Sequence, residues 1–229
     1  MKKIILILFI FFGFNLSAQQ LAFTTVDFKA KDNSQENLVD LFDKFFEDAK
    51  FKSGSILLER LWQGRVKGMT HRIVWIWELD NGGRADDMKE YENEAFWAQA
   101  NHYIEEWGDA KSGRILSWHE GDVKEFPYGH IWDMTPKDPV AFKKAHDKIV
   151  KKAAEMFENK VVGFGTYDIN RPNGATHWVV IGEKDTNGHL SMYNTFENDY
   201  AKAMEELIIT RGEVEFIHDF MIEVLKRYQ

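Results

Sequence analysis

The stretch GMTHRIVWIW, residues 68–77, decides the fold, because it is a glycine turn followed by a strand. Its β-branched and aromatic residues are typical of a strand whose two faces are both covered. A second version of the pattern, GATHWVVIGE, occupies residues 174–183. Gly-x-Thr-His leads into both strands, so that His71 and His177 take the same place, 106 residues apart. The two stretches therefore indicate an internal repeat.

Elements of the same kinds surround both stretches. Hydrophobic periodicity predicts the order strand, helix, strand, strand, helix, strand, and then the same order again. Asp27 and Asp133 fall in the first strand of each series, at the same separation of 106 residues. A duplication of this kind predicts two α+β units, which span residues 19–126 and 127–229.

The C-terminal part of the second unit is harder to assign. Asp185 to Gly188 has the residues of a turn, and Thr195 is expected to cap the helix that follows. For residues 213–229 the repeat requires a strand, whereas the apolar residues recur at helical spacing. Both assignments stay open, and the spacing favours a helix.

The N-terminus has the pattern of a secretory signal peptide. Two lysines precede an apolar run from Ile4 to Phe14, and the small residue Ala18 precedes a polar one. The run is shorter than the roughly 20 apolar residues that a membrane-spanning helix needs. We therefore expect residues 1–18 to be removed and the protein to be exported, either to the periplasm or as a secreted protein. No second apolar run predicts a membrane span.

The composition argues against several classes of function. The chain has 37 acidic and 29 basic residues, a formal net charge of −8, and no basic stripe, so nucleic acid is not an expected partner. It has no cysteine, which removes disulfides and sulfur-ligated metals. The sequence also lacks His-Glu-x-x-His, Gly-x-Ser-x-Gly, a phosphate loop and a dinucleotide fingerprint. No metal site, hydrolase, kinase or dehydrogenase is predicted.

The repeated order of elements resembles two ferredoxin-like units in tandem. Two such units, with their sheets face to face and their helices outside, look like the dimeric α+β barrel superfamily, here closed within one chain. This resemblance implies a ligand site between sheet and helices or inside the barrel. The superfamily includes cofactor-free monooxygenases, haem-degrading enzymes and chlorite-dismutase-like haem proteins. Haem is therefore the one cofactor implied, and His102 takes the place on a second helix where haem-degrading relatives carry a ligand.

Two pairs of polar residues are the candidates for catalysis. The first and third strands of a ferredoxin-like sheet are neighbours, so each aspartate is expected near the histidine of its own unit. The pairs are Asp27 with His71, and Asp133 with His177. A carboxylate beside an imidazole fixes its tautomer and raises its basicity. The alternative is that the Gly-x-Thr-His segments only satisfy the backbone at the strand entry.

Aromatic residues gather on the predicted strands and provide material for a flat ligand pocket. The residues expected to bind a ligand are Trp75, Trp77, Trp132, His130 and His119. The alternative is that the indoles are packed core, because both faces of such sheets are covered.

Three hypotheses of function remain. The first is a non-enzymatic exported protein that binds a small aromatic or apolar ligand in the barrel. The second is a cofactor-free or haem-dependent monooxygenase-like enzyme of the same fold. The third is a structural or interaction protein whose barrel is packed core without a pocket.

Overall fold

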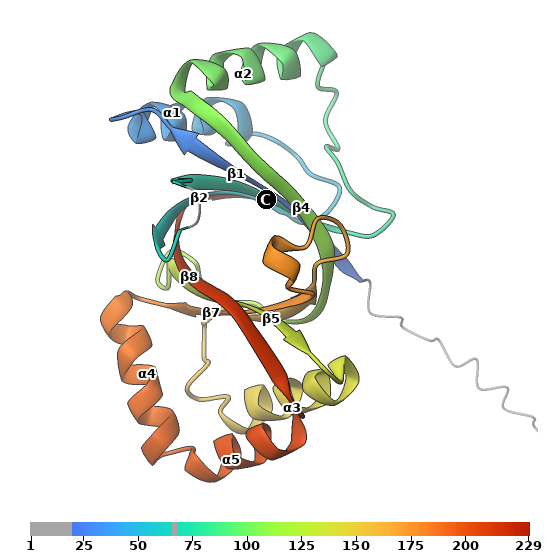
Figure 1. Cartoon of the computed structure of the whole chain (residues 1–229). Helices are drawn as coiled ribbons and strands as arrows, with labels where there is room; N and C mark the ends of the chain where they lie inside the picture. Colours follow the sequence, from blue (N-terminus) through green and yellow to red (C-terminus); the bar gives the residue numbers. More distant parts are fainter. Residues whose placement is uncertain (1–19, 66–67) are drawn as a thin grey trace, which may run out of the picture.

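Eight antiparallel strands form a closed barrel, which Figure 1 shows roughly along its axis. The structure is a computed structural model that describes residues 20–65 and 68–229. The strands are β1 (Leu21–Ala30), β2 (Ser55–Gln63), β3 (His71–Glu78), β4 (Ile104–His119), β5 (Tyr128–Pro136), β6 (Val162–Thr166), β7 (His177–Glu183) and β8 (Val214–Tyr228). The helices are α1 (Gln35–Phe46), α2 (Glu90–Tyr103), α3 (Pro139–Lys152), α4 (Thr186–Asn198) and α5 (Ala201–Thr210), with a short 3₁₀ turn η1 (Pro172–Gly174).

The order of strands around the ring is β1-β3-β2-β8-β5-β7-β6-β4. Each half of the chain contributes one sheet, β4-β1-β3-β2 from the first and β8-β5-β7-β6 from the second. The pairs β2–β8 and β4–β6 join the two sheets into the ring. The expected α+β barrel with helices outside is therefore confirmed, whereas a duplication of the sequence and the unit boundaries 19–126 and 127–229 stay predictions.

Alternation along each strand sends one set of side chains into the barrel and the other towards the helices. On β1, Phe23 packs inside the barrel against Trp178, with ring centroids 5.4 Å apart, whereas Phe28 faces outwards into the core under α1 and α2. A third core lies under α3, α4 and α5 on the opposite outer face. The helices thus cover two outer faces of one barrel. Inside the barrel and under each helical layer, a ligand would have to occupy space that core side chains also fill.

The Gly-x-Thr-His segments perform the same backbone task in both halves. The amide of Thr70 donates to the carbonyl of Phe28 at 3.0 Å, and the amide of Thr176 donates to the carbonyl of Met134 at 3.1 Å. The carbonyl of Thr70 accepts from the amide of Leu61 on β2, and the carbonyl of Thr176 accepts from the amide of Tyr167, just after β6, both at 2.8 Å. These hydrogen bonds satisfy backbone groups where each strand begins, which is the alternative role that the sequence analysis gave to the Gly-x-Thr-His segments.

Three expectations for the C-terminal part were wrong. Thr195 does not cap a helix, because it lies inside α4 and donates to the Ser191 carbonyl at 3.2 Å. Residues 213–229 do not form a helix: β8 fills the gap between β2 and β5, and the main-chain bonds of both neighbours outweigh the helical spacing of its apolar residues. Residues 185–188 are not a turn either. The Asp185 side chain accepts from the amide of Gly188 at 2.7 Å and so caps α4, which already begins at Thr186.

The expected signal peptide, residues 1–18, lies outside the described residues. Within the described ranges no helix has the length and apolar character that a membrane crossing requires.

Candidate functional site: an outer cavity in the second half

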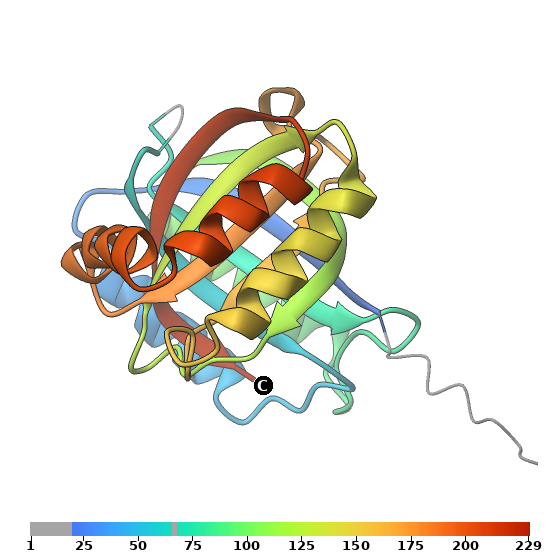
Figure 2. The ribbon, with the colours of Figure 1, turned by 90° about the horizontal axis from the view of Figure 1, so that it is seen from below.

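A cavity of about 740 Å³ lies between the outer face of the second sheet and the helices α3, α4 and α5. Figure 2 shows α3 and α5 side by side over the strands, with α4 continuing from the edge. Most of the lining is apolar and comes from the strands and from all three helices, including Trp132, Met134, Phe142, Ile149, Val179 and Phe196. We call this space the outer cavity.

The matching space in the first half is filled by aromatic rings. Phe96 of α2 stacks on Phe45 of α1 at 4.3 Å and meets Phe42 edge-on at 5.2 Å. Trp97 lies 4.7 Å from Phe96 and 6.2 Å from Trp75 of the sheet. The cavity left between these helices and the first sheet measures about 200 Å³. Between helices and sheet, the first face of the barrel is therefore packed and the second is hollow, whereas a groove of about 660 Å³ in the first half lies between α1 and α2 themselves.

A buried histidine, His146 of α3, belongs to the lining of the outer cavity and is 5% exposed. Its Nδ1 lies 3.4 Å from Oδ1 of Asp147 and its ring 5.6 Å from that of Phe164. Asp147 also accepts from Lys143 Nζ at 2.6 Å and from Ser117 Oγ at 2.5 Å. Burial raises the pKa of Asp147, but these hydrogen bonds outweigh it and hold the pKa well below its usual range.

The contact with Asp147 favours one tautomer of the neutral His146 ring. An ionised carboxylate can only accept, so in that tautomer Nδ1 carries the proton and Nε2 the lone pair. Among the residues that the structure describes, Nε2 is buried without a hydrogen-bond partner. Buried polar atoms of this kind are rare and call for an explanation, such as a ligand that is missing.

Arg211 is the second notable side chain of the lining. It directly follows α5, and Gly212, with a φ of 72°, ends the helix after it. The guanidinium lies over the ring of Phe216, 5.4 Å from its centroid. Within residues 20–65 and 68–229 its Nε has no hydrogen-bond partner and no carboxylate forms an ion pair with it. Burial lowers the pKa of Arg211.

The two expected Asp–His pairs do not form. Asp27 is paired in register with Arg72 and lines the inside of the barrel, whereas His71, one residue further along β3, points outwards onto Phe28. Successive residues of a strand face opposite sides, so a carboxylate and an imidazole with this register lie on opposite faces of the sheet. The same holds for Asp133, which faces Trp178 in register.

Both histidines of these pairs have local partners instead. His71 Nδ1 lies 2.9 Å from Thr70 Oγ1, and its Nε2 lies 3.2 Å from Gln35 Oε1. Burial lowers the pKa of His71 to about 4, so the ring is neutral at pH 7. His177 Nδ1 lies 2.8 Å from Thr176 Oγ1 and the ring is buried. These contacts are those of satisfied structural side chains.

The aromatic candidates divide between the two outer faces. Trp75 and Trp77 line the small cavity of the first half, whereas Trp132 lines the outer cavity. The ring of His130 lies 3.8 Å from that of Trp132 and is tilted by 33° to it, and its Nε2 lies 2.8 Å from Asp219 Oδ2. His119 is exposed at the end of β4. Of the five expected ligand-binding residues, Trp132 is thus the one that lines the hollow face.

The haem candidate His102 lies in the last turn of α2 and is exposed. Its carbonyl accepts from Lys31 Nζ at 2.7 Å, and the residue belongs to the packed half. His146 and Arg211 were missed by the sequence analysis. The sequence did contain a signal for His146. The residue lies one helical turn after Phe142 and next to Ala145, and both of these are buried on α3, so the helical spacing places His146 on the buried face of the helix.

The barrel interior contains two smaller chambers. An apolar chamber of about 110 Å³ and a polar one of about 440 Å³ share Thr25, Arg72 and Tyr167 in their linings. Arg72 pairs with the buried Glu59. Tyr167 donates to Asp133 Oδ1 at 2.7 Å, and burial raises the pKa of both groups. The interior polar groups therefore mostly satisfy one another.

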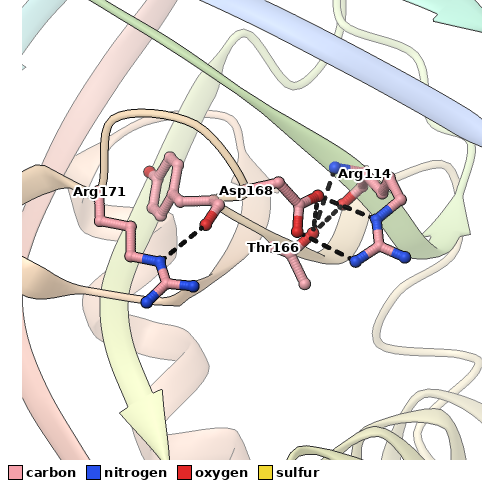
Figure 3. A network of polar contacts seen from close by, with 5 residues as sticks. Arg114, Thr166, Asp168 and Arg171 are labelled. Carbon is pink, nitrogen blue, oxygen red and sulfur yellow. Dashed lines mark hydrogen bonds and ion pairs between the residues drawn. The ribbon is translucent and has the colours of Figure 1, made fainter.

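A loop between β6 and β7 borders the polar chamber. Figure 3 shows how it is fixed: Arg114 of β4 donates to both carboxylate oxygens of Asp168, at 2.9 and 3.0 Å. Thr166 Oγ1 donates to the same carboxylate at 2.8 Å, and Arg171 Nε donates to the Tyr167 carbonyl at 3.4 Å. This network holds Arg171 at the rim of the polar chamber.

No group of three or more potential metal ligands occurs in the part of the chain that the structure describes.

Solved structures of other proteins share the barrel. A protein of Lactobacillus acidophilus NCFM with the provisional name of monooxygenase is 11% identical, with a TM-score of 0.63 over 92% of this chain and 96% of its own. A second provisionally named monooxygenase, from Fusobacterium nucleatum subsp. nucleatum ATCC 25586, is 14% identical, with a TM-score of 0.58 over 93% and 95%. A mutant of chlorite dismutase from Candidatus Nitrospira defluvii is 10% identical, with a TM-score of 0.50 over 92% and 93%. These likenesses show the dimeric α+β barrel fold. No protein-family model matches the chain, and no curated protein matches its sequence.

Proposed function

We propose that the chain binds a small, largely apolar ligand in the outer cavity. The observation that carries this proposal is the contrast between the two outer faces of one barrel: between helices and sheet, the second face keeps a mainly apolar space of about 740 Å³ and the first about 200 Å³. Small-molecule sites commonly measure roughly 300 to 1,000 Å³ and are lined mainly by apolar side chains. Part of this lining is in contact with water, since Ile208, Ile209 and Phe216 are 56%, 71% and 53% exposed. A ligand that covers the lining removes apolar surface from water, which is favourable.

The barrel interior is the weaker location. Its apolar chamber, about 110 Å³, is smaller than the sites that bind most small ligands. Its second chamber, about 440 Å³, is polar, and its lining includes Arg72, which pairs with Glu59, and the pair of Asp27 and Lys111. A largely apolar ligand in this chamber would cover charged groups and remove them from water, which is costly.

A cavity-filling substitution tests the proposal. Ala201 of α5 lines the outer cavity, whereas its exposed neighbour Lys202 does not. We expect the neutral fluorescent probe N-phenyl-1-naphthylamine to bind the purified protein, to lose at least tenfold in affinity in Ala201→Trp, and to be unaffected in Lys202→Trp. Binding that is the same in both variants would place the ligand elsewhere.

A haem-dependent or other monooxygenase-like enzyme is the second candidate, because two structural neighbours are named as monooxygenases and one as chlorite dismutase. His146 is the observation that favours haem. A buried imidazole whose Nδ1 faces a carboxylate, with an unpartnered Nε2 in the lining of an apolar cavity, has the chemistry of a residue that would hold haem iron. His146 would hold the iron and Asp147 would orient the ring. Bound haem would supply redox chemistry at an iron with one protein ligand.

Haemin titration separates these possibilities. A Soret band that shifts on binding, is lost in His146→Ala and is kept in His102→Ala would favour haem. The exposed His102 is a suitable control because it lies on the packed half. A titration with no spectral change would leave the non-enzymatic ligand-binding function. The cofactor-free version of the hypothesis rested on the pairs Asp27–His71 and Asp133–His177, and neither of these pairs exists.

Export completes the proposal. The signal-peptide pattern of residues 1–18 supports a protein that binds its ligand outside the cytoplasm. Mass spectrometry of the protein recovered outside the cytoplasm should give an N-terminus at Gln19.

A further inference from the structure

We infer that the outer cavity takes ligands with a carboxylate on an apolar body, and that Arg211 binds this carboxylate. The inference rests on the proposed function and names the class of ligand for the same cavity. Its starting point is a cation in the lining that lacks a counter-ion among the described residues.

The acidic residues around Arg211 are already occupied. Glu206 pairs with two lysines of α3, and Glu213 pairs with Lys137. Arg211 stacks on Phe216 instead of meeting a carboxylate. A half-buried guanidinium without a counter-ion has lost part of its hydration and regained no ion pair, and such a group binds an incoming anion strongly.

The acidic residues of the cavity lining do not act as counter-ions of Arg211. Glu197 and Glu205 also belong to the lining, but both are exposed, where water and salt screen their field. Arginine offers planar, paired donors that match a carboxylate. The geometry of the lining therefore favours an anionic group of this shape at Arg211.

Three apolar side chains of the lining are exposed. Ile208, Ile209 and Phe216 all line the cavity, and they are 56%, 71% and 53% exposed. Exposed apolar side chains next to a hollow face are typical of a ligand-binding surface. A ligand with one anionic end and an apolar body satisfies both features, since the body covers the apolar lining while the charged end meets Arg211.

An isosteric pair of ligands tests the inference. Calorimetric titration of the full mature chain with 2-naphthoate and with neutral 2-naphthamide compares a carboxylate and an amide of the same shape. We expect naphthoate to bind at least about tenfold more tightly, because hydrogen bonds to charged groups are worth that much. Arg211→Gln should remove this preference and leave naphthamide binding unchanged, while Arg211→Lys should keep part of it.

Arg171→Gln is the matched control, because it removes the same charge from an arginine at the polar chamber of the barrel instead. It should leave both affinities unchanged. Equal affinities of the two ligands, or a preference that survives in Arg211→Gln or falls equally in Arg171→Gln, would overturn the inference and leave the proposed function intact. Binding of neither ligand, together with failure of N-phenyl-1-naphthylamine to bind, would overturn both.

Discussion

Replacement of His146 by leucine should raise the free energy of unfolding of the ligand-free protein. His146 is 5% exposed, and its Nε2 is buried without a hydrogen-bond partner among the described residues. A buried polar atom left unsatisfied costs about 1–3 kcal/mol, and leucine of similar volume removes this cost. The substitution also loses the 3.4 Å contact with Asp147, which keeps its bonds to Lys143 and Ser117. The net expectation is a gain of about 1 kcal/mol.

His71→Leu provides the opposite case within the same protein. Its two ring nitrogens lie 2.9 Å from Thr70 Oγ1 and 3.2 Å from Gln35 Oε1, so the substitution removes two hydrogen bonds, although Thr70 Oγ1 keeps the one from the Ala30 amide. We expect the free energy of unfolding to fall by about 1–3 kcal/mol. Urea denaturation followed by circular dichroism measures both. With an m-value of about 2 kcal/mol/M, His146→Leu should move the midpoint up by about 0.5 M.

The result that would refute this reasoning is a loss of stability in His146→Leu as large as that in His71→Leu. His146 would then be an ordinary core histidine, and the link between its buried nitrogen and a ligand would fail.

Two further predictions concern pH and the closure of the barrel. Burial lowers the pKa of His71 to about 4, against about 6.5 in the unfolded chain. Between these two pH values the unfolded state binds more protons than the folded state, so the free energy of unfolding should fall as the pH falls from about 6.5 to 4. His71→Gln should flatten this part of the profile of unfolding free energy against pH. At Gly113 of β4 an added Cβ would lie 1.7 Å from the Thr166 carbonyl oxygen, so Gly113→Ala should separate β4 from β6 and lower the unfolding free energy by more than about 2 kcal/mol. An unchanged melting temperature in Gly113→Ala would show that this contact between the strands can yield.

Much of the fold could be predicted because its signals are local. The Gly-x-Thr-His segments at residues 68–71 and 174–177 mark the start of the third strand in each half. In the structure both threonines make equivalent main-chain hydrogen bonds there. The Asp138 cap and Pro139 correctly mark the start of α3, where the carboxylate accepts from the amides of Val140 and Ala141. The groups that form a helix cap or a turn are only a few residues apart, so the sequence around them contains all the residues that take part.

The candidate site could be predicted only in part. Trp132 was expected to bind a ligand and does line the outer cavity, but Trp75 stands in the same kind of place on the packed face. Their surroundings differ because Phe45 and Phe96 fill the first half, and those residues lie on helices distant in the sequence from either tryptophan. A cavity is a space between elements, so no residue of its lining indicates it alone.

The sequence by itself determined the order of the elements and most of their classes, because hydrophobic periodicity and turn residues are local properties; the closed α+β barrel was expected from the resemblance of this order to known folds. Only the tertiary structure decided which face each residue takes, since a shift of one residue exchanges the two faces of a strand. It separated Asp27 from His71 in this way. It also made residues 214–228 a strand, because the groups that pair with this segment belong to β2 and β5, far away along the chain.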